Sequence, residues 1–335
     1  MNVTATTNYY NATGLTPDTR HTIGTRTVDA SDNINMSWVN HTARSAPLDT
    51  TPPVTVANLT GSISNNGWYI SNVQVSLMAT DNEGGSGVNK TEYSFDGANW
   101  STYTVPLTVT NEGTTSVYYS STDNAGNVES AKNRSISIDK TPPQVTINKP
   151  ANGSEYILNQ TLIASWSAYD LLSGVASATG TASNGSTIDT DTVGAKVFSV
   201  TATDYAGNNV TQTASYTIAY NFLGIQPPIR SDGSSIFKLG STIPVKFRVA
   251  DANGNYVSTV VSNLTHQKIT DEIFGRIEES ISTSAANDGN TFRYDITDNL
   301  YIFNLGTSGM ATGTYQLSIN LDDGTVKIVR ISIKQ

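Results

Sequence analysis

Apolar and polar positions alternate with a period of two along most of this 335-residue chain. In residues 73–79, and again in residues 162–168, apolar side chains occupy every second position up to an aspartate. A period of two is typical of β-strands, because successive side chains point to opposite faces. No long stretch has the spacing of an amphipathic helix. The pattern therefore predicts an all-β chain of antiparallel sandwiches.

A short turn motif ends several of the alternating runs. It reads Thr-Asp-Asn-Ala-Gly-Asn at 122–127 and Thr-Asp-Tyr-Ala-Gly-Asn at 203–208, with a looser copy at 28–33. An aspartate accepts hydrogen bonds from backbone N–H groups just ahead of it, while glycine and asparagine tolerate a positive φ. We therefore predict a tight hairpin turn at each copy, and not a metal loop.

Two proline connectors divide the chain. Asp-Thr-Thr-Pro-Pro stands at 49–53 and Asp-Lys-Thr-Pro-Pro at 139–143. Paired prolines fix φ and remove two donors, so each connector is a stiff, natural start of a domain. Ser-Gly-Val follows the first alternating strand in both copies, at 86–88 and 173–175. We predict two Ig-like β-sandwiches, at 48–140 and 141–219.

The first 47 residues carry a Gly-Leu-Thr-Pro-Asp-Thr corner at 14–19, followed by strand-like residues 23–28. This stretch resembles the C-terminal half of a fibronectin type III domain, with His21 where that family carries tyrosine. Half a sandwich cannot bury both of its faces. We expect residues 1–47 to be poorly stabilised unless another chain completes the domain.

Residues 48–140 resemble the Ig-like β domain family named after a spirochaete outer-membrane protein. The resemblance rests on Gly-Trp-Tyr-Ile-Ser at 67–71, Glu-Tyr-Ser-Phe-Asp-Gly at 92–97, Trp100, Tyr118 and the turn at 122–127. Residues 141–219 resemble the broader bacterial Ig-like repeats. Both resemblances imply modules of prokaryotic surface and secreted proteins.

Residues 220–335 break the repeat period. Hairpin signals stand at Asn253-Gly254 and Asp323-Gly324, while residues 271–280 fit either a helical turn or a bulged strand. Strand patterns lie at 243–249, 300–305, 315–321 and 326–333. Pro244-Val245-Lys246-Phe247 resembles the motif of the PxKF module, a C-terminal β domain of prokaryotic exported proteins that implies no activity.

Composition excludes several classes of function. The net charge is −9 and the isoelectric point is about 4.7, which argues against binding to nucleic acid. The chain has no cysteine, so disulfides, thiolate metal sites and cysteine nucleophiles are excluded. It has no apolar run of transmembrane length and no signal-peptide pattern at its start. We therefore expect a piece of a longer protein whose leader and anchor lie elsewhere.

The candidate chemistry for catalysis is weak. The histidines are His21, His41 and His266, and none lies in a recognisable motif for activating a nucleophile. No pair of carboxylates is singled out for glycoside hydrolysis. We predict that the chain is not an enzyme and uses no cofactor.

Calcium is the alternative to simple turn capping at several aspartates. Asp251-Ala-Asn-Gly-Asn begins like an EF-hand loop, but Tyr256 and Ser262 replace the glycine and glutamate that such a loop requires. We interpret it as a hairpin turn.

Calcium binding near the proline connectors is a second possibility. Asp81, Asn82 and Glu83 can chelate calcium, as can Asp49 or Asp139 beside an interdomain turn. Calcium at such a place would stiffen the junction between modules. Turn capping remains the favoured interpretation, so no metal site is predicted.

Three aromatic residues are candidates for a carbohydrate site. Trp68, Trp100 and Tyr103 can form a platform for sugar rings, although packing on the sandwich is favoured for these side chains.

Asparagine-linked glycosylation is a further possibility that composition alone also accounts for. Asn-x-Ser/Thr motifs occur at Asn2, Asn11, Asn35, Asn40, Asn58, Asn89, Asn99, Asn133, Asn152, Asn159, Asn184, Asn209 and Asn263.

Taken as a whole, the sequence predicts a non-catalytic structural or adhesive region, a stalk or spacer, of an extracellular or cell-surface protein of bacterial or archaeal origin. The alternative is the accessory tail of an exported hydrolase whose catalytic domain is not in this chain. In either case, the expected partners are cell-envelope polysaccharide or another surface protein.

Overall fold

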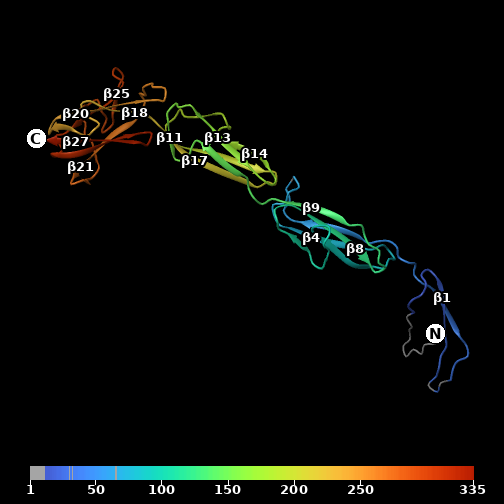
Figure 1. The fold of residues 1–335 in the computed structure, drawn as a ribbon. Coiled ribbons are helices and arrows are strands. Elements are labelled where there is room, and N and C mark those ends of the chain that lie inside the picture. The colour runs from blue at the N-terminus through green and yellow to red at the C-terminus, as the bar shows by residue number, and fades with distance from the viewer. Residues whose placement is uncertain (1–11, 30, 32, 65) are drawn as a thin grey trace. The chain divides into compact units, whose positions relative to one another are not determined.

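The computed structural model describes residues 12–29, 31, 33–64 and 66–335 (Figure 1). The described residues form antiparallel β-sheets with two parallel strand pairs and no helix. The predicted all-β fold is confirmed. The chain divides into two compact units, Met1–Lys140 and Thr141–Gln335, and each unit is described by itself.

The N-terminal segment, residues 12–47, forms a single hairpin. Strand β1 (Arg20–Thr25) pairs with β2 (Val39–Arg44) in an antiparallel register that sets Arg20 opposite Arg44. All of β2 is exposed, and His21 is the one half-buried residue of β1. None of the described residues in this segment is buried. This hairpin therefore has no core of its own, and its weak stability stays a prediction.

Residues 48–140 form a sandwich of two sheets. The first sheet runs in the order β3 (Val54–Thr60), β4 (Val73–Thr80) and β7 (Leu107–Val109). The second sheet runs in the order β6 (Ser101–Thr102), β5 (Val88–Ser94), β8 (Gly113–Asp123) and β9 (Lys132–Ile138).

The alternating residues of this module build its core. Val73 and Val75 of β4 are fully buried, and so are Val117 of β8 and both Ile136 and Ile138 of β9. Their neighbours within the strands are exposed or half-buried, which is the arrangement that the period of two predicts. These residues belong to one hydrophobic cluster drawn from residues 57–138 alone.

The next module uses three small sheets. They are β11 (Ser154–Ile157), β17 (Asn209–Ala219), β16 (Gly194–Asp204) and β14 (Val175–Gly180) in that order; β10 (Gln144–Lys149) with β13 (Ser165–Tyr169); and β12 (Leu162–Ile163) with β15 (Thr187–Ile188). Strand β11 runs parallel to β17.

The last module, residues 220–335, has two larger sheets. One is ordered β18 (Asn221–Gln226), β20 (Thr242–Ala250), β25 (Leu300–Gly306) and β24 (Arg293–Asp295). The other is ordered β19 (Ser235–Lys238), β27 (Val326–Lys334), β26 (Gly313–Leu321), β21 (Ser262–Thr270) and β22 (Ile273–Phe274), with β23 (Glu278–Glu279) also on β21.

Two features of this module answer open points from the sequence. Residues 271–280 contain no helical turn; Asp271 and Glu272, both at positive φ, make a hairpin into β22. Pro244 lies inside β20, where it faces Asn304 of β25. Strand β18 pairs with β20 only as far as Lys246. Pro244 is therefore tolerated because no strand lies on its other side to require its missing N–H.

Residues 141–335 share one hydrophobic core. A single cluster of buried side chains runs from Leu158 and Ile218 of one module to Phe247 and Ile333 of the next. Backbone and side-chain hydrogen bonds reinforce it. The N–H of Ala252 donates to the Leu158 carbonyl at 2.9 Å, and the side-chain amide of Asn159 donates to Oδ2 of Asp251 at 3.0 Å. The last two modules are therefore fused through their interiors.

Candidate functional site

The repeated Asp-x-x-Gly-Asn turns adopt one geometry, here called the aspartate clasp. At Asp123, the backbone N–H of Asn127 donates to Oδ1 at 2.8 Å and its side-chain amide donates to Oδ2 at 2.7 Å. The N–H of Asp123 donates back to the Asn127 carbonyl at 3.2 Å. The clasp of Asp204 with Asn208 has the same three bonds, at 2.8, 2.9 and 3.0 Å. The predicted hairpin turns are confirmed.

The same clasp occurs at two further aspartates. Asp29 binds Asn33 through bonds of 2.9, 2.9 and 3.0 Å. Asp251 binds Asn255 through bonds of 2.9, 3.1 and 2.9 Å, so its interpretation as a turn and not an EF-hand loop is confirmed. The side-chain amide of Asn159, which donates to Asp251 at 3.0 Å, is the main reason that the pKa of Asp251 falls to about 2.

The Ser-Gly-Val loops fasten onto the clasps. In the first module, the N–H of Asn124 donates to the Gly87 carbonyl at 2.9 Å and the N–H of Ala125 donates to Oγ of Ser86 at 2.9 Å. The second module repeats both bonds with the residues Tyr205, Gly174, Ala206 and Ser173, at 3.0 and 3.2 Å. Both motifs can be recognised in the sequence, but their pairing in space was not predicted. Their recurrence in the same order was the signal that could have suggested it.

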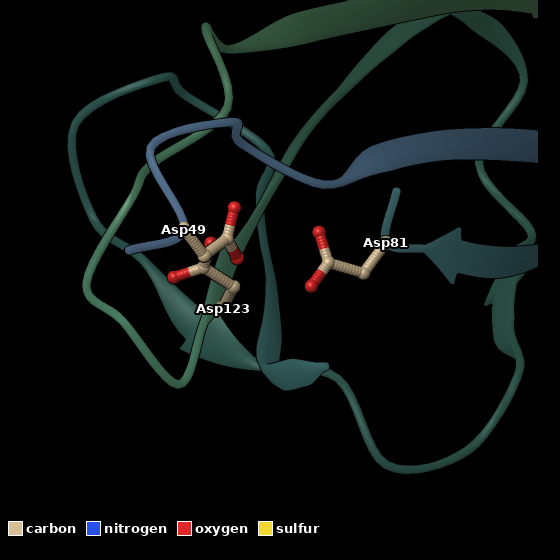
Figure 2. A group of neighbouring side chains, drawn as sticks. All are labelled: Asp49, Asp81 and Asp123. Carbon is tan, nitrogen blue, oxygen red and sulfur yellow. The ribbon is translucent and has the colours of Figure 1, made fainter. Parts of the chain in front are cut away.

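Three carboxylates meet at the end of the first Ig-like module. Asp49 belongs to the proline connector, Asp81 follows β4 directly, and Asp123 ends β8. One oxygen from each lies within 4.8 Å of the others. Figure 2 shows the carboxylate of Asp81 pointing toward those of Asp49 and Asp123. Asp123 is fully buried, and the other two are half-buried.

Every oxygen of Asp49 and Asp81 accepts a backbone hydrogen bond. For Asp49 the donors are Thr51 at 3.1 Å and Ser86 at 2.8 Å. For Asp81 they are Asn82 at 3.0 Å and Gly87 at 2.6 Å. The Ser86 N–H is the largest cause of the lowered pKa of Asp49. Both aspartates therefore cap turns, as the sequence favoured.

The three carboxylates could also hold a divalent cation. Each oxygen keeps a second lone pair beside its hydrogen bond, and calcium takes six to eight oxygen ligands of this type. Within the described residues, no ion pair with lysine or arginine neutralises this group. A melting temperature that differs between calcium and EGTA would show that the group binds an ion. An unchanged value would leave turn capping as its role.

Three other residues considered for calcium lie outside this group. Asn82 and Glu83 are exposed and do not belong to the three-carboxylate group. Asp139 follows β9; its side chain is buried, and its N–H donates to the Tyr69 carbonyl at 2.9 Å. The grouping of Asp49 and Asp123 with Asp81 was missed because these residues are far apart in sequence.

The three aromatic candidates are not gathered on one surface. Tyr103 packs against the core, and its hydroxyl accepts the N–H of Leu77 at 3.1 Å. Trp100 is 37% exposed and directly precedes β6, at one edge of the second sheet. Trp68 is half-buried next to Tyr69, which bridges to β9 at the opposite edge. Sugar binding by these residues stays a prediction, with Trp100 the most accessible ring.

The histidines take structural positions. Nε2 of His21 lies 3.2 Å from the Thr16 carbonyl. The tyrosine of a fibronectin-like corner makes the same kind of bond back to the chain. His41 lies on the exposed strand β2.

His266 is buried between two partners. Its Nδ1 lies 3.0 Å from Oγ of Ser280, and its Nε2 lies 3.6 Å from the carboxylate of Glu278. Burial lowers the pKa of His266, and Glu278 partly opposes that shift. Although these three residues resemble a Ser-His-acid set, Ser280 is only 3% exposed. A nucleophile must reach its substrate, so this serine is placed to pack and not to react.

This chain is similar to several solved structures, each at low sequence identity. No protein-family model matches the sequence, and no curated protein matches it. Among solved structures, the fibronectin(III)-like modules of Clostridium thermocellum CbhA are 14% identical, over 57% of this chain and 95% of that one, with a TM-score of 0.21. Sidekick-1 immunoglobulin domains 1–5 are 12% identical, over 92% and 65%, with a TM-score of 0.31.

A third similar structure comes from Bacteroides ovatus. It is the protein SGBP-B of a mixed-linkage glucan utilization locus, solved in complex with a mixed-linkage heptasaccharide. It is 10% identical, over 85% of this chain and 71% of that one, with a TM-score of 0.20. The antiparallel sheets of this chain form tandem β-sandwich modules that resemble Ig-like and fibronectin-like domains. No helix among its described residues is long and apolar enough to cross a membrane.

Proposed function

We propose that this chain is a non-catalytic spacer of a prokaryotic cell-surface or secreted protein. The observation that carries the proposal is the way in which the modules are fastened. The connector residue Asp49 accepts the N–H of Ser86 through its carboxylate, and its carbonyl accepts the Asn127 amide at 3.2 Å. A connector residue whose carboxylate and carbonyl are both bonded to the module that follows it cannot move against that module as a free linker residue does.

The shared core of residues 141–335 supports the same role. Interfaces between domains of one chain are usually small and polar, and relative motion is then expected. Here the modules bury apolar side chains in a common cluster and add the bond between Asn159 and Asp251. Stiffness of this kind suits a region that holds another part of the protein at a distance.

Distance distributions between two dyes test the spacer. The chain has no cysteine, so Ser177→Cys with Ser308→Cys would give two unique labels at exposed positions of the last two modules. We expect one narrow distribution of distances by single-molecule energy transfer. A broad distribution that narrows only with a bound partner would contradict the proposal. A pair within one module, Ser177→Cys with Ser183→Cys, is the matched control for dye mobility.

The second candidate is an accessory region that binds cell-envelope polysaccharide. It rests on the exposed ring of Trp100 at a sheet edge, because indole rings stack on the apolar faces of sugars. A glycan array tests it directly. Binding that Trp100→Ala abolishes and Trp68→Ala leaves intact would favour the accessory region. A blank array together with the narrow distance distribution would favour the spacer.

A further inference from the structure

The asparagines of the glycosylation motifs differ in exposure from the other asparagines. Eleven of the motifs have their asparagine among the described residues, and all eleven of these asparagines are exposed. Of the seventeen other described asparagines, ten are exposed and seven are half-buried. A motif that arose only from composition would show the mixed exposure of the second group. The difference in exposure therefore points to a function of the motif asparagines that needs access from solvent.

Besides Asn40 with Thr42 on β2 of the N-terminal hairpin, three of these motifs lie inside strands with both key residues facing out. They are Asn58 with Thr60 on β3, Asn133 with Ser135 on β9, and Asn209 with Thr211 on β17. A period of two places the asparagine and the hydroxyl two positions later on the same face of a strand. All six residues are exposed. Among the described residues, none of the three asparagine side chains has a hydrogen-bond partner.

In two other motifs, the side-chain NH2 group of the asparagine already donates a hydrogen bond within the fold. The side-chain amide of Asn99 donates to Asp96 at 2.6 Å. The side-chain amide of Asn159 donates to Asp251 at 3.0 Å, and Asn159 itself stands at a φ of 59°. Attaching a sugar there would crowd a turn and a contact between modules. These two asparagines are matched internal controls for the three on strands.

Strand β3 gives an independent reason for a bulky hydrophilic group. It is the edge of its sheet and pairs only with β4. Its sequence, Val-Thr-Val-Ala-Asn-Leu-Thr, has no charge and no proline, and Val54 and Val56 are each 54% exposed. Uncharged apolar edges invite pairing with other chains, and proteins commonly block them. A glycan on Asn58 would provide that block, as would one on Asn133 of the edge strand β9.

We propose that Asn58, Asn133 and Asn209 carry asparagine-linked oligosaccharides. The co-reactant is an oligosaccharide joined through its anomeric carbon to a lipid phosphate or diphosphate. The bond between that carbon and the phosphate oxygen breaks, and the lipid phosphate leaves with the electron pair. A bond from Nδ2 to the anomeric carbon forms while the amide releases one proton. The proposal does not depend on the spacer role.

Peptide mass spectrometry of the chain isolated from the cells that produce it tests the proposal. We expect sugar mass on the peptides of Asn58, Asn133 and Asn209, located on the asparagine by electron-transfer fragmentation. Peptides of Asn99 and Asn159 should have their unmodified mass. Unmodified peptides at all three strand positions would overturn the proposal, and so would sugar located on serine or threonine.

Variants at the first motif separate the chemistry from folding. Asn58→Gln and Thr60→Ala should each remove the sugar from this peptide, whereas Thr60→Ser should keep it, because the motif needs a hydroxyl. All three variants, made in a host without the transferase, should melt at the temperature of the parent chain, since both positions are exposed. Sugar retained on residue 58 in Thr60→Ala would overturn the proposal. The distance measurement for the spacer is unaffected by either result.

Discussion

The N-terminal hairpin and the first Ig-like module contain the same turn in opposite surroundings. Asp29 and Asp123 clasp their asparagines with nearly equal bonds, 2.9 Å against 2.8 Å to the backbone N–H. Beside Asp29 no described residue is buried, whereas Asp123 is itself fully buried beside the core strand β8. The clasp is therefore local chemistry that forms from its own five residues. The clasp forms the turn of a hairpin, whereas burial of apolar side chains stabilises the folded domain.

The largest expected effect is that only one of the two regions unfolds cooperatively. Residues 48–140 alone should unfold in one cooperative transition, because they contain a complete hydrophobic cluster. Residues 1–50 alone should show no cooperative transition. Circular dichroism melts of the two fragments provide the measurement. A cooperative transition of the short fragment would mean that the clasp and hairpin suffice.

A matched pair of isoleucine truncations tests how much burial stabilises each region. Ile136 is fully buried on β9, while Ile23 on β1 is 41% exposed. Ile136→Ala should lower the free energy of unfolding of its module by about 3 kcal/mol, from lost burial and the cavity that remains. Ile23→Ala should leave that value unchanged. Urea titration of the two variants measures both, and equal losses would contradict the comparison.

A second pair removes the clasp itself. Asp123→Ala leaves two half-buried donors, the backbone N–H and the side-chain amide of Asn127, without their acceptor and should destabilise the first Ig-like module by about 2 kcal/mol. Asp29→Ala removes the same bonds in an exposed hairpin and should not move the melting temperature of the module. Asp123→Asn, which keeps an acceptor oxygen, is the intermediate control. If Asp123→Ala left the stability of the module unchanged, the clasp would set the shape of the turn without stabilising the module.

The smallest expected effect is a dependence of the stability of the fold on pH, caused by the buried histidine. Burial lowers the pKa of His266 below its usual 6.5, so the unfolded chain binds its proton more readily than the folded chain does. Its neutral form therefore stabilises the fold fully above pH 6.5. That contribution falls as the pH drops below 6.5 and levels off below the folded pKa.

The groups facing His266 are Ser280, Glu278 and the ring of Tyr315. His266→Gln should flatten the decline in melting temperature between pH 7 and pH 5, whereas His41→Gln in the exposed hairpin should not. A decline of the same size in His266→Gln would assign the pH dependence to other groups.

Local patterns in the sequence predicted the local parts of this structure. The alternation at residues 73–79 became the strand β4, and the aspartate motifs became turns, because both depend on neighbours within a few residues. The corner at Thr16 likewise met His21 only five residues away.

The features that sequence analysis missed depend on contacts between distant residues. Asp49 and Asp123 meet because two sheets close on each other, and no periodicity contains that distance. Trp68 and Trp100 looked like one surface in the sequence, but the strand order β6-β5-β8-β9 separates their edges. Residues 271–280 stayed ambiguous because β22 and β23 are only two residues long and pair with β21 alone.

The common interior of residues 141–335 has a consequence for how such chains can be rearranged. A cut at residue 219 would remove the residues that cover Leu158 and Ile218, and would leave Asp251 without its partner Asn159. Each half would expose side chains of the common core at that boundary. Recombination of genes that shuffles single modules would therefore fail here, and residues 141–335 would be transferred between proteins as one inherited block.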